Sequence, residues 1–179
     1  MGTRNLTIVH QDCNYKVAQY CRWDGHPEGQ GKIVLEALHQ INLSDFREKV
    51  AKVNQVTTEQ IEAYFDNDPP VDLHHFHRDC GGEIVELIAS GKINEVYSSL
   101  EFASDSILCE WAYVIDLDVN TFEVYSGFNE YPLTDDDRFC FLQTNDSPYF
   151  PVKLIAKWSL LSLPTLEEFF GELKVKELV

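Results

Sequence analysis

The sequence has little positive charge. Only 14 of its 179 residues are lysine or arginine, against 30 aspartates and glutamates, and the formal net charge at pH 7 is −16. Proteins that bind duplex nucleic acid need a basic surface that displaces the counterions of the phosphate backbone. We therefore expect no direct binding to duplex nucleic acid. A field of this sign favours a basic partner or a cationic ligand, and it also keeps the chain soluble.

Long hydrophobic runs and paired cysteines are missing as well. No apolar stretch approaches the length of a membrane span, and no N-terminal segment has the pattern of a secretory signal. The five cysteines are an odd number, and no two have C-x-x-C spacing. This usage indicates reduced thiols, so we predict a cytoplasmic protein that does not associate with membranes. The sequence does not indicate an oligomeric state.

The residues that are present can build a substantial core. Apolar residues make up 44% of the chain and aromatic residues 12%. Chains of this size and composition fold as one unit, and we expect a single domain over residues 1–179. The sequence Asn67-Asp68-Pro69-Pro70 is the clearest break, and in so short a chain it indicates a turn rather than a linker.

Hydrophobic periodicity changes along the chain from strands to helices and back to strands. The predicted strands cover residues 6–10, 15–20, 111–119, 121–125, 138–143 and 152–160. The predicted helices begin near Gly31, Ser44, Thr57, Leu73 and Thr165, with Ser44, Thr57 and Thr165 as N-caps. Because strand and helix runs are segregated, the pattern predicts an α+β fold. Its largely antiparallel sheet joins an N-terminal hairpin to the C-terminal strands, packed by a central helical block and a C-terminal helix.

The segment from Gln19 to Gly31 is the strongest candidate for a binding site. It is rich in glycine and in aromatic and charged side chains, a composition typical of a shaped loop between a strand and a helix. Its candidate ligand-binding residues are Tyr20, Arg22, Trp23, Glu28 and Gln30. The alternative is a structural loop that docks Trp23 onto the core.

A second candidate segment, Asp72 to Cys80, holds three of the six histidines. On a helix, His74 and His77 would share a face, where they could chelate a metal or act as general bases. They could equally make local hydrogen bonds on a half-exposed helix. No other ligand cluster has matching spacing, so we expect no metal and no cofactor.

Asp116 and Asp118 alternate on a predicted strand, and alternating carboxylates can hold a hard cation. Asp116 lies on a partly apolar face. If it is buried, it needs a partner such as Arg4 or Arg22.

Several blocks of the chain resemble an uncharacterised family of small proteins from bacteria, their mobile elements and fungi. The blocks are Met1-Gly2-Thr3-Arg4-Asn5-Leu6-Thr7, residues 15–20, Trp23-Asp24-Gly25, residues 27–31 and residues 111–116. The family usually has tyrosine where this chain has His26, and Gly-Gln where it has Cys21-Arg22. The resemblance implies no established activity.

The order of a hairpin, helices and antiparallel strands also resembles that of the N-terminal-nucleophile hydrolases. That resemblance implies a nucleophile at the processed first residue, with its own amine as the base. In this chain Thr3 would become such a residue only after cleavage beyond Gly2.

These observations leave two functional hypotheses. The first is an acidic binding protein, a phage or mobile-element accessory factor of the anti-defence type that inhibits a basic, nucleic-acid-handling host protein. The alternative is a hydrolase that cleaves amides or RNA at a site shared by the 20–31 loop and the 74–79 histidines. Its candidate catalytic residues are Thr3, Arg4, Asp24, His26, His77 and Asp79.

Overall fold

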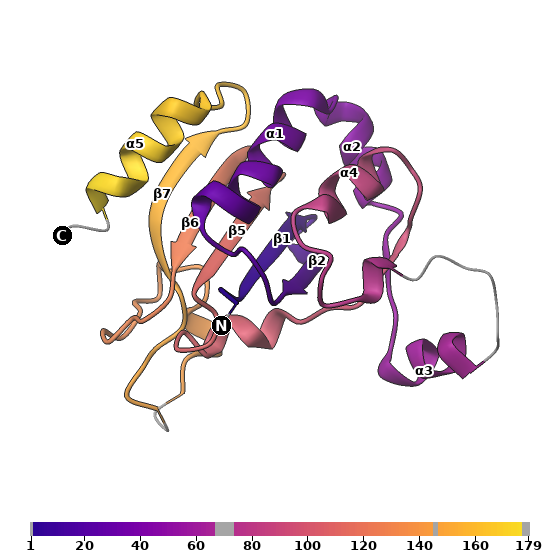
Figure 1. Cartoon of the computed structure of the whole chain (residues 1–179), viewed down its shortest axis with the longest axis horizontal. Coiled ribbons are helices and arrows are strands. Elements are labelled where there is room, and N and C mark those ends of the chain that lie inside the picture. The colour runs from indigo at the N-terminus through magenta and orange to yellow at the C-terminus, as the bar shows by residue number, and fades with distance from the viewer. Residues whose placement is uncertain (1, 67–73, 145–146, 177–179) are drawn as a thin grey trace.

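A computed structural model describes residues 2–66, 74–144 and 147–176. Five strands form one sheet in the order β2-β1-β5-β6-β7. The strands are β1 (Asn5–Gln11), β2 (Asn14–Cys21), β5 (Trp111–Asp116), β6 (Thr121–Ser126) and β7 (Lys153–Ser159). The prediction of an α+β fold with a largely antiparallel sheet is confirmed, and the sheet joins the N-terminal hairpin to the later strands (Figure 1).

Three of the four strand pairs are antiparallel, and β1 pairs with β5 in parallel. The predicted N-terminal hairpin turns at Asp12 and Cys13, whose φ angles are 55° and 56°. A two-residue hairpin turn that matches the twist of the strands requires positive φ at both of its central residues. The parallel pair sets Asn5 beside Trp111 and therefore places the start of the chain in the middle of the sheet.

Four helices cover one face of the sheet (Figure 1). They are α1 (Lys32–Gln40), α2 (Leu43–Val50), α4 (Glu83–Ala89) and α5 (Leu166–Lys176). Their inward side chains, such as Leu35, Phe46, Ile84 and Phe169, form one core with alternate residues of the strands. None of the described helices has both the length and the apolar character needed to cross a membrane.

The second face of the sheet is covered by irregular chain. Short 3₁₀ turns η3 (Leu100–Ser104) and η4 (Cys140–Leu142) bring Ala103 and Leu142 onto a second core with Ile8, Val114 and Tyr125. The sheet is therefore buried on both faces, which explains why all six residues of β5 are buried.

The remaining elements lie beside the main sheet. A small parallel sheet pairs β3 (Asn54–Gln55) with β4 (Glu95–Val96). Helix α3 (Thr58–Asp66) begins with the predicted capping box, in which Thr57 and Gln60 exchange hydrogen bonds. Thr165 caps α5 as predicted, and it makes the same exchange of hydrogen bonds with Glu168. The predicted turn at residues 67–70 lies outside the described residues.

The prediction of one helix from Leu73 through the histidines is wrong. Leu73 lies outside the described residues, His74–Phe76 forms only the 3₁₀ turn η2, and α4 begins at Glu83. The reason is the pair of glycines before α4, which packs against the segment preceding α1. A Cβ at Gly81 would lie 2.3 Å from the Gln30 side-chain oxygen. Adjacent glycines also favour a break, because each costs a helix about 1 kcal/mol relative to alanine.

Two further predictions are corrected. Residues 138–143 form a turn rather than a strand, because Phe139 and Leu142 are buried at a spacing of three while Phe141 between them is exposed. The N-cap of α2 is Asn42 rather than Ser44. The Asn42 side chain accepts the N–H groups of Ser44 and Asp45 at 2.9 and 3.1 Å.

Candidate functional site

The loop after β2 is fixed by hydrogen bonds to the chain start and to β5. Asp24 takes a φ of 51°, and its carbonyl accepts the N–H of Gln30 at 2.8 Å. Gly25 N–H donates to the Thr3 carbonyl at 3.0 Å. The Gly25 carbonyl accepts the buried hydroxyl of Tyr113 at 2.7 Å. Since these backbone groups are paired with separate elements, the loop is held in one conformation.

Two further features fix the same loop. The Asn5 side-chain amide donates to the carbonyls of Cys21 and Trp23, each at 3.3 Å. The chain then passes through η1 (Pro27–Gly31), a single π-helical turn that leads into α1. A Cβ at Gly29 would lie 2.2 Å from the Asp24 carbonyl oxygen, so this turn requires glycine there.

Four of the predicted site residues come together on the outside of this loop. The Arg22 guanidinium lies 4.4 Å from the centre of the Trp23 ring. Arg22 Nε is 3.4 Å from an Asp79 carboxylate oxygen, and His77 Nδ1 is 3.1 Å from the other oxygen of Asp79. The 20–31 loop and the histidine segment therefore meet, as the hydrolase hypothesis requires, but they meet at an exposed surface.

Trp23 does not dock onto the core. Its side chain is 42% exposed, and its inner face is occupied by the backbone at Gly2, where a Cβ would lie 2.2 Å from the ring. The alternative in which the loop serves to bury Trp23 is therefore wrong.

A second group joins Thr3 to His26. The Thr3 hydroxyl oxygen lies 2.7 Å from His26 Nε2 across a separation of 23 residues. Thr3 is 9% exposed, and His26 is exposed. A hydroxyl within hydrogen-bond reach of an imidazole is the arrangement of an activated nucleophile and its base.

The other predicted site residues have different surroundings. Arg4 donates its backbone N–H to Glu110 at 3.3 Å. Gln30 is structural, because its buried side-chain oxygen accepts the N–H of Gly82 at 2.7 Å. Tyr20 faces the second core, edge-on to Phe102 at 4.8 Å. The side chains of Asp24 and Glu28 are exposed.

A polar site missed by the sequence analysis lies on the second face of the sheet. The Arg138 guanidinium donates to Asp116 and, at 2.9 Å, to Glu123. Glu123 also accepts the hydroxyl of Tyr125 at 2.7 Å and lies 3.1 Å from Lys157 Nζ. Asp116 and Glu123 are 3% and 2% exposed. The expected partners of Asp116, Arg4 or Arg22, are therefore wrong, and the partner is Arg138.

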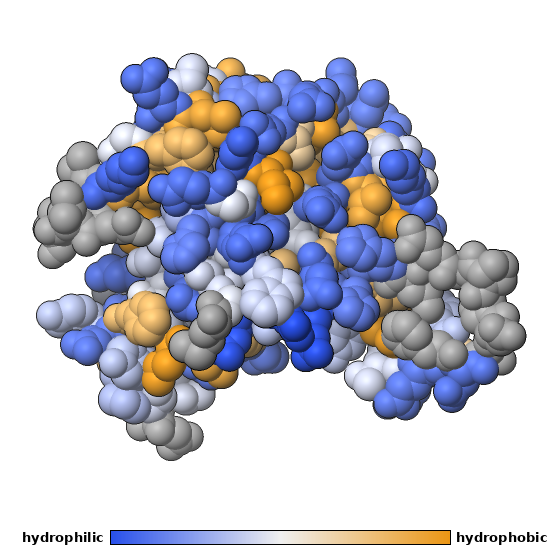
Figure 2. All heavy atoms as spheres, in the orientation of Figure 1, coloured by the Kyte–Doolittle hydropathy of each residue, from blue (hydrophilic) through white to orange (hydrophobic). Residues whose placement is uncertain are grey.

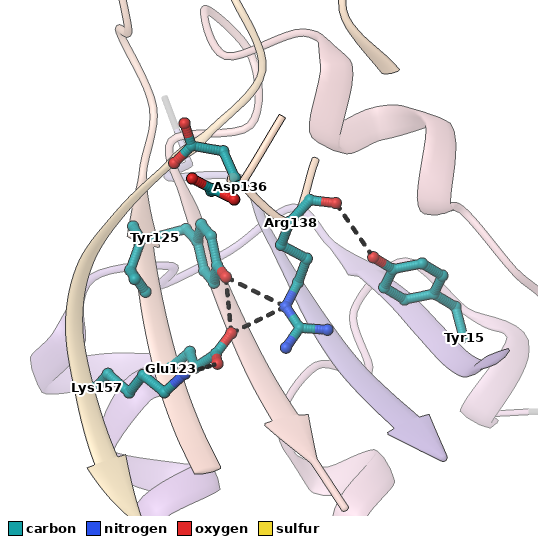
Figure 3. A pocket seen from close by; sticks show the side chains of 8 residues that line it. Tyr15, Glu123, Tyr125, Asp136, Arg138 and Lys157 are labelled. Carbon is teal, nitrogen blue, oxygen red and sulfur yellow. Dashed lines mark hydrogen bonds and ion pairs between the residues drawn. The ribbon is translucent and has the colours of Figure 1, made fainter. Parts of the chain in front are cut away.

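Glu123, Tyr125, Arg138 and Lys157 of this network line a cavity of about 320 Å³, together with Tyr15 and Asp136. Figure 3 shows Arg138 between Tyr125 and Tyr15. The Tyr15 hydroxyl donates to the Arg138 carbonyl at 3.4 Å. Because the buried charges satisfy one another, the arrangement attaches the segment after β6 to the sheet.

The pKa values of the two buried carboxyl groups follow from this pairing. Burial acts to raise the pKa of Asp116 and of Glu123. The hydrogen bonds and charge of Arg138 outweigh burial, so the pKa of each group lies below its ordinary value. Both carboxylates are therefore ionised at neutral pH.

The only sequence signal for this network is Asp116 on an apolar strand. Its cation comes from a segment that the sequence analysis assigned to a strand of its own. A buried carboxylate requires a partner, but the pattern does not say which distant arginine supplies it.

The buried cysteines are poor nucleophiles. Burial raises the pKa of the Cys21 and Cys109 thiols, and it raises that of Cys80 to about 12. The reactive species of cysteine is the thiolate, so these three thiols are inert at neutral pH.

Comparison of the chain with known protein families, with curated proteins and with solved structures gives no match. The resemblance to an uncharacterised family therefore stays a prediction.

Proposed function

We propose that this chain is an acidic binding protein whose 22–28 loop docks onto a basic protein. The observation that carries the proposal is a loop held rigid by buried hydrogen bonds that nevertheless presents Trp23, 42% exposed, to solvent. Burying a tryptophan stabilises a protein, so an exposed one on a fixed loop is suited to a contact with another molecule.

The composition of the loop surface matches that of interface hot spots. Tryptophan and arginine carry a large share of binding energy in protein complexes, and here Arg22 stacks on Trp23 at 4.4 Å. Because the loop backbone is already ordered, little conformational entropy is lost when a partner binds.

Charge supports a basic partner. The chain carries 30 acidic and 14 basic residues. Among the described residues, lysine and arginine side chains form ion pairs with Glu36, Asp79, Asp116 and Glu123. Asp24 and Glu28, in the same loop as Trp23, are exposed carboxylates. Such a surface accelerates encounter with a positively charged protein, and the acceleration weakens with added salt.

The surface in Figure 2 also favours recognition through charge and single aromatic anchors. In this view hydrophilic residues dominate, and hydrophobic residues form small separate groups. Large permanent interfaces use broad apolar patches. The partner class that fits best is a nucleic-acid-handling protein, whose basic surface the chain would occupy. This corresponds to a cytoplasmic accessory factor of a mobile element that inhibits a host protein.

The charge requirement is tested by capture at low and high salt. The immobilised full chain is exposed to a nuclease-treated extract, and the captured proteins are identified after a salt step. We expect basic nucleic-acid-binding proteins that elute as salt rises. Glu28→Lys should reduce their recovery several-fold more than Glu130→Lys, which changes the net charge equally at another exposed position. Equal losses in the two variants would show that only the overall charge matters.

A hydrolase remains a second candidate because of the Thr3–His26 contact at 2.7 Å. In this reading His26 takes the hydroxyl proton while Thr3 attacks an acyl carbon. A reactive acyl or phosphonyl probe should label Thr3, and both Thr3→Val and His26→Ala should abolish the labelling. An unlabelled Thr3 in the folded parent protein would remove this candidate.

A further inference from the structure

Three metal-ligating side chains converge at the turn end of β1 and β5. His10 lies near the end of β1, Asp116 ends β5, and Asp118 lies in the turn to β6. His10 Nδ1 is 3.4 Å from Asp116 Oδ2 and 3.3 Å from Asp118 Oδ2. All three atoms lie within 4.8 Å of one another. We propose that these residues form a binding site for a divalent transition-metal ion of the zinc type.

The separations of both carboxylate oxygens from His10 Nδ1 fit a tetrahedral ion. Zinc binds imidazole nitrogen and carboxylate oxygen at about 2.0–2.2 Å, which sets neighbouring ligand atoms about 3.3–3.5 Å apart. The two distances from His10 Nδ1, 3.4 and 3.3 Å, match that separation. A hydrogen bond from the ring would bring one of the oxygens closer than about 3.2 Å.

The contacts of His10 Nδ1 leave it available to a metal. This nitrogen is enclosed and makes no hydrogen bond, although two carboxylates face it. Those contacts are ion pairs only if the ring is protonated, and a neutral imidazole nitrogen is a metal ligand. One cation placed between the three atoms would satisfy the nitrogen and both oxygens together.

The carboxylates are already oriented by backbone hydrogen bonds. The N–H groups of Asp12 and Cys13 donate to the two oxygens of Asp118 at 2.8 and 2.9 Å. The N–H groups of Asp118 and Val119 donate to Asp116 Oδ1 at 2.9 and 3.1 Å. Metal ligands are characteristically held by such outer hydrogen bonds, which lower the cost of assembling the site.

Arg138 supports this geometry. It donates to Asp116 Oδ2, and a carboxylate oxygen has a second lone pair for a metal. Arg138 pairs with both Asp116 and Glu123, and Lys157 pairs with Glu123. The Asp118 side chain is 28% exposed, so an ion can enter from solvent. Three protein ligands leave the fourth position for water.

A second cluster offers a direct comparison. His74, Cys80 and Glu83 also bring three ligand atoms within 4.8 Å. There, the His74 and Glu83 side chains are 51% and 54% exposed, whereas those of His10, Asp116 and Asp118 are 16%, 4% and 28% exposed. The His10 site is the better ligand set. It lies at the opposite end of β1 from Thr3, so the inference does not rest on the proposed function.

The test is titration of the chelator-treated full chain with Zn²⁺ by calorimetry. We expect binding of one ion, with affinity reduced at least about tenfold by His10→Asn and by Asp118→Asn. The matched variant His74→Asn should bind as the parent does. Circular dichroism confirms that each variant is folded. Failure of the parent to bind Zn²⁺, or loss of binding in His74→Asn with retention in His10→Asn, overturns the inference.

Cobalt distinguishes the two ligand sets without any mutation. Co²⁺ at the His10 site has nitrogen and oxygen ligands, so we expect tetrahedral d–d absorption without a thiolate-to-cobalt charge-transfer band. A charge-transfer band would show a thiolate ligand, from Cys80 or from the exposed Cys13, and would contradict the proposed ligand set.

Discussion

Arg138 is the cation on which the buried charges of this protein depend. It contacts Asp116 and Glu123, which are both nearly inaccessible to solvent. Removing one member of a buried ion pair typically costs about 3–5 kcal/mol, because an uncompensated charge stays behind. Arg138 also belongs to the irregular segment over the second face. The loss of this one side chain would therefore remove the ionic attachment of that segment, which Phe139 and Leu142 also hold through the second core.

Glu123 makes part of the stability depend on pH. Burial acts to raise the pKa of Glu123, but the opposing effect of Arg138 is larger. The pKa of Glu123 in the folded protein therefore lies below its ordinary value. Such a group stabilises the fold above its unfolded pKa, and the contribution is lost as pH falls through the folded pKa. We expect Glu123→Gln to cost about 1–3 kcal/mol at pH 7. The difference in the free energy of unfolding between parent and variant should shrink below about pH 4. Urea unfolding at pH 7 and pH 3 measures it, and an equal deficit at both would contradict this assignment.

Two glycines predict opposite responses to the same substitution. A Cβ at Gly29 would lie 2.2 Å from the Asp24 carbonyl, whereas a Cβ at Gly171 in α5 meets nothing within 4 Å. Gly29→Ala should therefore destabilise the protein by about 1–3 kcal/mol through forced movement of the loop. Gly171→Ala should be neutral or stabilise by up to about 1 kcal/mol, because alanine favours helix. Thermal unfolding measures both, and a Gly29→Ala variant as stable as the parent would argue against a fixed loop.

Elements with local signals were predictable from the sequence. The hairpin of β1 and β2 follows from two alternating runs around a turn, and α3 and α5 follow from their capping boxes. The elements that the sequence pattern predicted wrongly depend on distant contacts. Gly81 and Gly82 end regular structure because they pack against Gln30 and Val34, and no local pattern carries that information.

The start of α2 gives a direct test of local capping. Asn42 accepts two backbone N–H groups, whereas Ser44 lies inside the first turn. We expect Asn42→Ala to cost about 1 kcal/mol and Ser44→Ala to change stability by less than about 0.5 kcal/mol. Chemical unfolding of the two variants decides between the caps. A larger loss for Ser44→Ala would restore the residue that the sequence pattern indicated.

The architecture of the sheet explains why the candidate site was only partly predictable. Residues from the loop were recognisable by composition, and the antiparallel pairing of β1 with β2, which sets Asn5 opposite Cys21, brings Thr3 to the turn at Gly25. The Thr3–His26 contact follows from that pairing. The approach of Asp79 to Arg22 depends on a distant contact, in which Arg22 N–H donates to the Arg78 carbonyl at 3.0 Å. Sequence periodicity assigns faces to strands, but it does not say which distant loops meet at the end of a sheet.

For the whole molecule, we expect that the 22–28 loop, and not the acidic surface in general, selects the partner. Phe141 is the control for Trp23, because it is also an exposed aromatic residue, 56% accessible. It contacts Tyr15 near the opposite end of β2. The measurement is the dissociation constant of the purified captured partner for Trp23→Ala and for Phe141→Ala. We expect Trp23→Ala to weaken binding at least about tenfold. Phe141→Ala should stay within about twofold of the parent, as expected for a residue outside the interface. Equal effects of the two variants, or full affinity in Trp23→Ala, would contradict a docking role for the loop.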